Sequence, residues 1–527
     1  MWGPIARMPR RLHWAAIFIM LFASTAQGQE PDIIIEGEVP PGSETHFFVP
    51  FQVPDGIVEI EIRHDNLTPG NILDWGLDDP NGFRGWGGGN SEPAIVGVEA
   101  ATPSYVPGPI PAGTWEVVVG KARIDELPAL YRIEIFLRTE ATLEDQPRTP
   151  YQDPGVLDDE ARWYAGDFHV HSRQSGDADP TIEEALDYAK GVGLDFVMLS
   201  EHNTNSGLTL YGSVQPDYSD VLIIPGVEWT TYSGHANAIG ATEWVDHKTG
   251  VRGTTVDDAI QDYRDQGAVF YPTHPTEPSW NLCLGCMWEY DVDPTTLGGS
   301  EVWTAQGWKD SVKYWEDLCS EGSHAVAIGG SDDHHAGEPG PPNTRPIGTP
   351  TTMVFAENLS VEAVLDGVKA GRTVVKVNGI DGPMLETELT GERVGDTVFA
   401  DASTLSAVVT GGEGFSLLVF KNGEETSRIA IDSDPFTHQQ EVTAPEEGED
   451  RYRHQVSGTT PQTIGSYVWL RAAGEPPDGG SPDGGTEPSR SSGCNCRVTS
   501  PADQDTAVLL FFIGALGYFW RSRRRST

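Results

Sequence analysis

Two histidines with the spacing of a metal-binding pair lie at positions 169 and 171, at the end of a short apolar run. Residues i and i+2 of a β-strand point to the same face, so the imidazoles of His169 and His171 can reach one ion. A solvated or hydrogen-bonded pair has the same spacing, so the pair alone does not decide the matter. Nine of the 14 His lie between positions 169 and 335, which favours one multinuclear metal site.

Most of these histidines stand beside Asp, Glu, Pro or Gly at the expected ends of strands. The candidate metal ligands are His169, His171, Asp177, His202, Glu228, His235, His274, Asp332 and His334. Imidazole together with carboxylate suits zinc, manganese or iron. A carboxylate such as Glu228 can bridge two ions, which a neutral imidazole cannot. We expect two to three divalent metal ions, because these ligands are more than one ion can use.

Strand-like and helix-like runs alternate from about residue 160, and they predict the elements that position these side chains. Apolar runs that predict strands lie at 196–200, 221–225, 268–272 and 325–329. A capping box at Thr181 and Glu184 predicts a helix to about Val192, and Thr255 and Ser360 begin two more. Apolar strands alternating with helices predict a parallel sheet or barrel, in which function gathers at the C-terminal ends of the strands.

The regions before and after this metal-binding middle region have sequence patterns typical of β-sheet. Residues 30 to about 145 contain alternating or apolar runs between Pro and Gly turns, which predicts a β-sandwich. Residues from about 384 to 472 return to strands and predict a second, smaller sandwich. The predicted divisions are 29–155 for the N-terminal β-sandwich, 156–383 for the metal-binding domain and 384–472 for the C-terminal β-sandwich.

The middle region resembles the PHP (polymerase and histidinol phosphatase) superfamily, whose motifs it carries in the family's order. The resemblance implies a distorted seven-stranded (β/α) barrel, flanked here by β-sandwich domains, that holds up to three metals. It assigns His169, His171, Glu228 and Asp332 to the first metal. It assigns Glu228, His235 and His274 to the second metal, and Asp177, His202 and His334 to the third.

Some positions depart from the family pattern. Asp177 stands where some members have His, and Glu201 replaces the usual Asp before His202. Some relatives place the ligand two residues after His235, where this chain has Asn237, and both would face the same way on a strand. His335 has no family counterpart. A looser resemblance links the middle region to the branch named for carbaryl hydrolase, the CehA/McbA-type metallohydrolases, through four stretches. These are 234–240, 301–303, 329–334 and 370–373.

The implied chemistry is hydrolysis by metal-activated water, with Glu228, Asp332 and His334 as the candidate catalytic residues. No Gly-x-Ser-x-Gly elbow argues for a serine enzyme. The leading hypothesis is an exported, surface-associated phosphoesterase that acts on small phosphomonoesters or diesters. The alternatives are a carbamate or carboxyl-ester hydrolase, a 5′-end nuclease, and a surface binding protein whose metal site is vestigial.

The two ends of the chain predict export. Three Arg, a short apolar run and Ala26-Gln27-Gly28 predict a signal peptide over 1–28, with a membrane anchor less favoured because the run is about half of a span. A Pro/Gly-rich linker over 473–493 precedes a tail over 494–527 with a Cys motif, an apolar run and four Arg. This tail resembles myxobacterial-type C-terminal sorting signals, and a plain transmembrane tail anchor is the alternative. We expect the protein on the outer cell surface, in the cell envelope or secreted.

The charge of the chain limits its partners. The formal net charge is −45. Removing 1–28 takes away three Arg and removing 497–527 takes away five Arg and two Asp, which leaves −51 for residues 29–496. A surface with this much negative charge repels polyanions at a distance. We therefore expect a small-molecule substrate and no extended nucleic-acid-binding surface.

Cysteine is scarce in the part of the chain that is expected to fold. Cys283 and Cys286 form a C-x-x-C motif, and Cys319 is the remaining one there. In an exported protein the simplest interpretation is one disulfide and one free thiol. The alternative is a structural zinc, which would need a fourth ligand.

Overall fold

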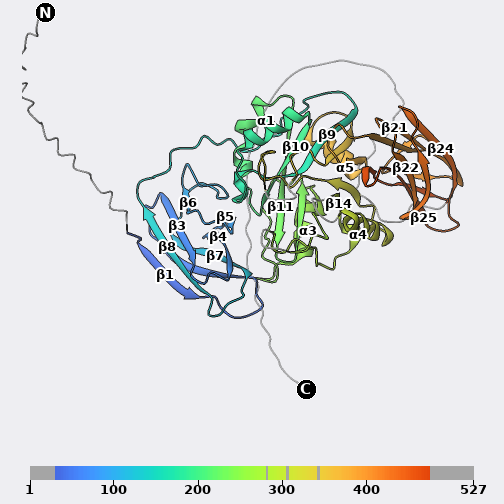
Figure 1. Ribbon diagram of the computed structural model, residues 1–527. Helices are drawn as coiled ribbons and strands as arrows, with labels where there is room; N and C mark the ends of the chain where they lie inside the picture. Colours follow the sequence, from blue (N-terminus) through green and yellow to red (C-terminus); the bar gives the residue numbers. More distant parts are fainter. Residues whose placement is uncertain (1–29, 280–282, 304–307, 341–344, 475–527) are drawn as a thin grey trace, which may run out of the picture. The chain divides into compact units, whose positions relative to one another are not determined.

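The computed structural model describes residues 30–279, 283–303, 308–340 and 345–474. The predicted signal peptide, almost all of the linker and the predicted tail lie outside these residues. The described part is multidomain and rich in strands, with few helices (Figure 1). Within it, no helix is long and apolar enough to cross a membrane.

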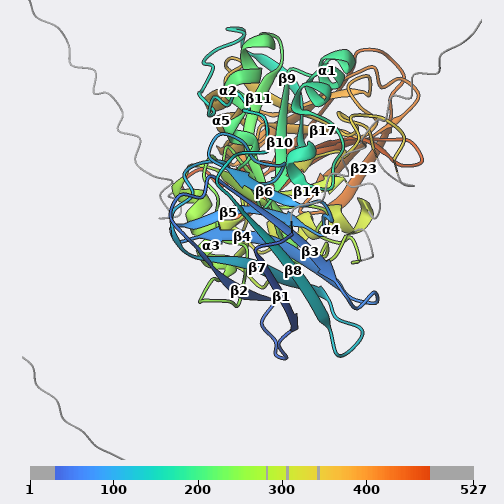
Figure 2. The same ribbon diagram turned by 90° about the vertical axis from the view of Figure 1, so that its left-hand side faces the viewer.

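The N-terminal strands form two antiparallel four-stranded sheets, as the alternating sequence predicted (Figure 2). One sheet has the order β1 (Ile33–Glu38), β8 (Leu130–Arg138), β3 (Glu59–Asn66), β6 (Ala94–Gly97). The other has the order β2 (His46–Val53), β7 (Gly113–Arg123), β4 (Ile72–Asp79), β5 (Gly82–Gly88). Alternate residues of β7, Trp115, Val117 and Val119, are almost fully buried in a shared apolar core. Period-two burial of this kind holds a sandwich together.

The middle region is built on three parallel strands that lie side by side, β9 (Arg162–Val170), β10 (Phe196–His202) and β11 (Leu222–Thr231) (Figure 1). The sheet then turns antiparallel on both sides. The further strands are β12 (Gly234–Ile239), β13 (Val269–Pro272), β16 (Thr351–Ala356) and β17 (Thr373–Lys376). The strands β14 (Gly299–Trp303) and β15 (Val326–Gly329) form a separate parallel pair.

The expected distorted (β/α) barrel is therefore not shown. Among the described strands of the middle region, parallel pairing is confined to β9–β11 and to β14–β15. Hairpin-like connections such as that from β11 to β12 place neighbours antiparallel. A parallel bridge between Val170 and Asp333 still brings the segment after β15 beside the end of β9. That contact places the last candidate ligands next to the first two.

The helices begin where the sequence predicted. Thr181 caps α1 (Ile182–Val192) in a complete capping box with Glu184, and Thr255 does the same for α3 (Val256–Asp265) with Asp258. Ser360 caps α5 (Val361–Lys369). The other helical segments are α2 (Tyr211–Val214), α4 (Trp308–Ser320), η1 (Arg173–Ser175), η2 (Gly207–Thr209), η3 (Gln215–Asp217) and η4 (Pro294–Thr296).

The C-terminal strands continue the large sheet, because β17 pairs with β26 (Pro461–Gly465), with Val374 opposite Gly465. The order then runs through β25 (Glu449–Ser457), β22 (Ser416–Lys421) and β23 (Glu424–Ala430). The strand β27 (Val468–Arg471) pairs with β25, and β20 (Thr397–Phe399) pairs with β27. A second sheet has the order β19 (Glu392–Arg393), β18 (Met384–Leu389), β21 (Ala402–Thr410), β24 (Phe436–Thr443). The predicted domain boundaries stay predictions.

Candidate metal centre

Eight of the nine candidate ligands lie on the strands of the middle region or close after them, and the structure brings them together with Asp177. His169 is on β9 and His171 follows it, His202 ends β10, and Glu228 lies opposite His202 on β11. His235 is on β12, His274 follows β13, and Asp332 and His334 follow β15. Parallel neighbours end at the same edge of a sheet, so side chains distant in sequence meet there.

Glu228 is the centre of the arrangement and has no exposed side-chain surface. Its Oε2 lies 3.5 Å from the Nε2 of His169 and 3.5 Å from the Nε2 of His171. The Oδ1 of Asp332 lies 3.2 Å from each of these two nitrogens. The two Nε2 atoms are buried and make no hydrogen bond within the described residues, and Glu228 Oε2 also lies 2.8 Å from the Nδ1 of His202. Buried polar atoms without partners are costly unless a ligand satisfies them, so these donors fit a cation.

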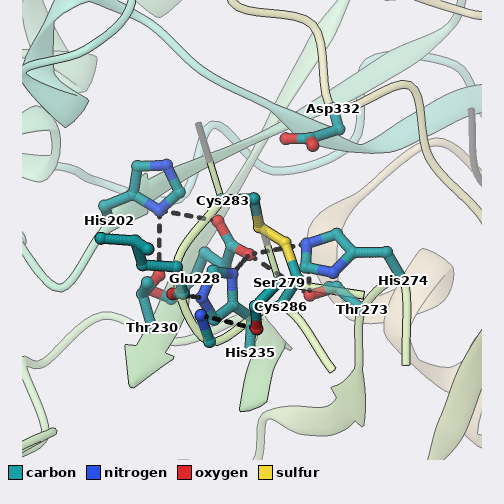
Figure 3. The surroundings of a disulfide bond; sticks show 12 residues. His202, Glu228, Thr230, His235, Thr273, His274, Ser279, Cys283, Cys286 and Asp332 are labelled. Carbon is teal, nitrogen blue, oxygen red and sulfur yellow. Dashed lines mark hydrogen bonds and ion pairs between the residues drawn. A yellow bond between two sulfur atoms is a disulfide. The ribbon is translucent and has the colours of Figure 1, made fainter. Parts of the chain in front are cut away.

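The other oxygen of Glu228 faces a second pair of imidazoles. Oε1 lies 3.2 Å from the Nδ1 of His235 and 3.5 Å from the Nε2 of His274 (Figure 3). The two carboxylate oxygens thus face different histidine pairs, which is the geometry that a bridging carboxylate requires. Asn237 donates instead to the carbonyl oxygen of Phe168 at 3.0 Å. The structure therefore places His235, and not Asn237, beside Glu228.

A third group lies at the more open side of the centre. The Nε2 of His202 is 3.3 Å from the Oδ2 of Asp177, and the Nε2 of His334 is 3.7 Å from the same oxygen. The Asp177 side chain is 56% exposed, against 0% for Glu228. His335 points elsewhere, because its Nδ1 lies 3.0 Å from Asp179. The imidazoles of this third group are 18% and 21% exposed, against 0–5% for those of the first two groups, so the third group marks the side from which a substrate can enter.

Two buried carboxylates that do not themselves join the centre orient its histidines. Ser175 donates to Glu201 at 2.7 Å, so its hydroxyl oxygen accepts the Nδ1 proton of His171 at 2.8 Å. Glu301 lies 3.3 Å from the Nδ1 of His169. Both contacts place the proton on Nδ1 and leave Nε2 to bind a cation.

Glu301 is a residue that the sequence analysis did not assign to the site. Its Oε2 also accepts the backbone N–H of His274 at 2.6 Å, so one carboxylate positions a histidine from each of the first two groups. Its signal in the sequence was weak, because it lies inside β14 and not at the end of a predicted strand. Its role in positioning His169 and His274 is apparent only from the folded structure.

The pKa values of the side chains indicate that the carboxylates of the centre favour a positive charge beside them. The nearby carboxylates of Asp332 and Glu228 raise the pKa of His169 well above its usual value, although burial opposes this. Burial, with help from His334 and His202, lowers the pKa of His171 to about 3. Burial raises the pKa of Glu201 to about 7, although Ser172 and Ser175 donate hydrogen bonds to it. A pocket that protonates one buried imidazole and keeps its neighbour neutral is suited to hold a cation.

The backbone is held in uncommon conformations at two of the candidate ligands. His274 has φ of 29° and Asp332 has φ of 56°, in the left-handed region that residues other than Gly rarely adopt. Asp167 helps to fix this geometry, because its carboxylate accepts the N–H groups of Ser331 at 3.1 Å and Gly348 at 2.8 Å. Local strain of this kind gathers at functional sites.

The N-terminal sandwich also contacts the loops that surround the centre. The hydroxyl of Tyr232, in the turn after β11, donates to Asp74 of β4 at 2.6 Å. Burial raises the pKa of Asp74 to about 6 even though Tyr232 donates to it. The hydroxyl of Thr204, just after β10, donates to the carbonyl oxygen of Ser104 at 2.9 Å. These contacts link the sandwich to the ends of the strands that carry Glu228 and His202.

We expect Glu301→Gln to weaken metal binding by about 10- to 100-fold, because such orienting carboxylates contribute about this much to metal affinity. Gln keeps the size of Glu301 but loses the charge that faces the Nδ1 proton of His169. Competition with a coloured chelator measures the affinity. Glu243→Gln, an exposed change outside the centre, is the matched control. Equal affinities in the two variants would show that Glu301 does not position the ligands.

No known family model matches this chain, and no curated protein matches it. Three solved structures resemble parts of it. One is a two-domain protein from Bacteroides vulgatus that contains a predicted PHP-like metal-dependent phosphoesterase. Its sequence is 18% identical, the match covers 62% of this chain and 99% of that protein, and the TM-score is 0.33. A proposed metal-dependent phosphoesterase from Bifidobacterium adolescentis is 14% identical, covers 38% and 95%, and has a TM-score of 0.26. A CARDB domain from Pyrococcus furiosus is 17% identical, covers 17% and 96%, and has a TM-score of 0.14. These scores are low, so the case for function depends on the geometry of the centre.

Proposed function

We propose that this protein is an exported, metal-dependent phosphoesterase of the PHP type that acts on small phosphate esters. The observation that carries the proposal is the set of imidazoles around the buried Glu228 carboxylate. The Nε2 atoms of His169 and His171, which make no hydrogen bond within the described residues, face one oxygen, and His235 and His274 face the other. No nucleophilic side chain is needed at such a centre. The parallel strands β9–β11, with β14–β15 beside them, would form the distorted barrel of that family.

The charge of the loaded centre supports an anionic substrate. Three of the ligands, Asp177, Glu228 and Asp332, are carboxylates, so two or three divalent cations would leave the ligand set with a net positive charge. That charge is local, whereas the negative charge of the whole chain is spread over its surface. A small phosphate ester can therefore be attracted at short range, where salt and distance weaken the general repulsion.

The side chains have separable roles in this proposal. Bound divalent cations would lower the pKa of water and polarise the phosphate ester. His169 and His171 present Nε2 from the buried side, and Glu228 spans the first two groups. His334 has its Nδ1 3.0 Å from the carbonyl oxygen of Asp332, so Nε2 is left to face the open side, where Asp177 lies. This arrangement fixes the imidazoles before a substrate arrives.

We expect small aryl or alkyl phosphate esters to be hydrolysed at low salt, and any activity on oligonucleotides to be weaker there and to rise as salt is added. The reason is that a polyanion experiences the long-range repulsion of the acidic chain, which salt screens over about 8 Å at physiological strength. A neutral carbamate should show almost no salt dependence. Initial rates for the three substrate classes, with added manganese or zinc, measure this.

The same assay separates the alternatives. If neutral carbamates or carboxyl esters are cleaved at least about tenfold faster than every phosphate ester, in kcat/KM, the protein is a carbaryl-hydrolase-like esterase instead. Cleavage of 5′ nucleic-acid ends above all small esters would identify a nuclease. A chain that binds metal but hydrolyses none of these substrates would support the surface binding protein.

Export and processing form a separate part of the proposal, and their support comes from the sequence of the two ends. We expect the mature protein to begin near Gln29 and to end near Cys494 to Cys496, at the cell envelope. Intact-mass analysis of the native protein measures both ends. A native chain that still carries residues 521–527 would favour the plain tail anchor over a cleaved sorting signal.

A further inference from the structure

The Cys283–Cys286 disulfide lies directly beside the candidate metal centre (Figure 3). The sequence predicted this disulfide but did not indicate its neighbours. In the structure a sulfur of each cysteine and a ring nitrogen of each of His235 and His274 all lie within 4.8 Å of one another. Cys319, the remaining cysteine of the described residues, is buried against the carbonyl oxygen of Ala325. The C-x-x-C motif thus meets the two ligands that a zinc site would require.

The dimensions of this group fit a tetrahedral ion. Zinc binds sulfur at about 2.3 Å and imidazole nitrogen at about 2.0–2.1 Å, so its ligand atoms lie about 3.3–3.8 Å apart. Two sulfurs in a disulfide are only about 2.05 Å apart, so the oxidised pair cannot enclose an ion with the histidines. Reduction removes that bond, and a separation of about 3.8 Å then becomes available. The Nδ1 of His274 is buried and makes no hydrogen bond within the described residues, whereas the Nδ1 of His235 faces Glu228 Oε1 at 3.2 Å.

The loop is held in place by contacts other than the disulfide. A Cβ at Gly285 would collide with the carbonyl oxygen of Thr231, and this glycine has φ of 83°, so the loop packs closely on the turn after β11. The carbonyl oxygen of Leu284 lies 3.3 Å from the Nε2 of His235, and Glu289 donates to Ser233 at 2.8 Å. These contacts do not involve sulfur, so the reduced cysteines would stay near the histidines.

We infer that Cys283 and Cys286, once reduced, form a Cys2His2 zinc site with His235 and His274. A dithiol reductant supplies the two electrons and two protons: it becomes a cyclic disulfide, and the chain gains two thiols. Zinc then displaces both thiol protons and binds the two sulfurs and two imidazoles. Both histidines also face Glu228. In the oxidised chain they can bind a metal ion together with Glu228, and in the reduced chain they bind zinc together with the two sulfurs. This site goes beyond hydrolysis and does not depend on the proposed activity.

Cobalt(II) tests the site, because charge transfer from sulfur to cobalt absorbs in the near ultraviolet and the other candidate ligands contain no sulfur. We use the full chain with Cys494→Ser and Cys496→Ser, which removes the thiols outside the described residues. The chain is stripped of metal, reduced with dithiothreitol, freed of it without oxygen and titrated with cobalt. We expect the sulfur band in the reduced chain and not in the oxidised chain. It should fall by about half or more in Cys283→Ser and in Cys286→Ser, and stay unchanged in Cys319→Ser.

A second measurement keeps both Cys283 and Cys286. It therefore does not depend on whether the Cys283→Ser and Cys286→Ser variants fold. Zinc should slow alkylation of Cys283 and Cys286 by iodoacetamide in the reduced chain by about tenfold or more, as mass spectrometry of the peptides would show. His235→Asn should lose most of this protection. The inference is wrong if the reduced chain gives no sulfur band, if the band keeps its full intensity in Cys283→Ser, or if zinc protects neither cysteine.

Discussion

Glu228→Gln is expected to lower kcat/KM by at least about 100-fold and to reduce the number of bound metal ions. Gln keeps the size of the side chain but loses the charge that faces two pairs of imidazoles, at 3.5 Å from Oε2 and at 3.2 and 3.5 Å from Oε1. Loss of one member of a buried, charged set costs about 3–5 kcal/mol, because the remaining members lose their compensation. Steady-state kinetics and elemental analysis of the same sample measure both effects.

His335→Ala is the matched control for this change. It removes an imidazole from the segment that carries Asp332 and His334, but His335 points away from the centre to Asp179. We expect its activity and metal content to stay close to those of the native chain. Equal losses in the two variants would mean that Glu228 does not bridge two groups of ligands.

Removal of metal is expected to abolish hydrolysis and to lower the unfolding temperature by on the order of 10 °C. A bound ion that the unfolded chain does not hold adds about 4 kcal/mol at a concentration of 1,000 Kd. The native chain should carry two to three transition-metal ions, since the ligands fall into three groups around Glu228, Asp332 and Asp177. Elemental analysis, differential scanning calorimetry and an activity assay before and after chelation measure these quantities.

Restoration separates a metal effect from damage by the chelator. Manganese or zinc added back should recover most of the activity and the unfolding temperature, whereas magnesium should recover less, because imidazole ligands suit transition metals better. A native chain with almost no metal, and no gain on addition, would contradict the interpretation of the centre. Stripping should not unfold the chain, because a proton on His169 supplies part of the missing positive charge.

The sequence by itself determined the features that depend on local order. Alternating runs predicted the strands of the N-terminal sandwich, and Thr181, Thr255 and Ser360 predicted three helix starts that the structure confirms. The C-x-x-C spacing predicted the disulfide. The candidate ligands could be named because His, Asp and Glu at strand ends are uncommon unless they bind or react. Each of these signals lies within a few residues of the feature that it predicts.

Only the tertiary structure decided which side chains meet. Strand direction cannot be read from apolar runs, so the parallel core of β9–β11 with its antiparallel neighbours differs from the parallel sheet or barrel that alternating elements predicted. The register of β12 against β11 places Asn237 opposite Glu228, yet it is His235 that faces the carboxylate, because the Asn237 side chain donates to the carbonyl oxygen of Phe168. Glu301, Asp74 and the pair Cys283 and Cys286 reach the centre across long separations in the chain. Such contacts arise from the packing of whole elements, and no local pattern in the sequence specifies them.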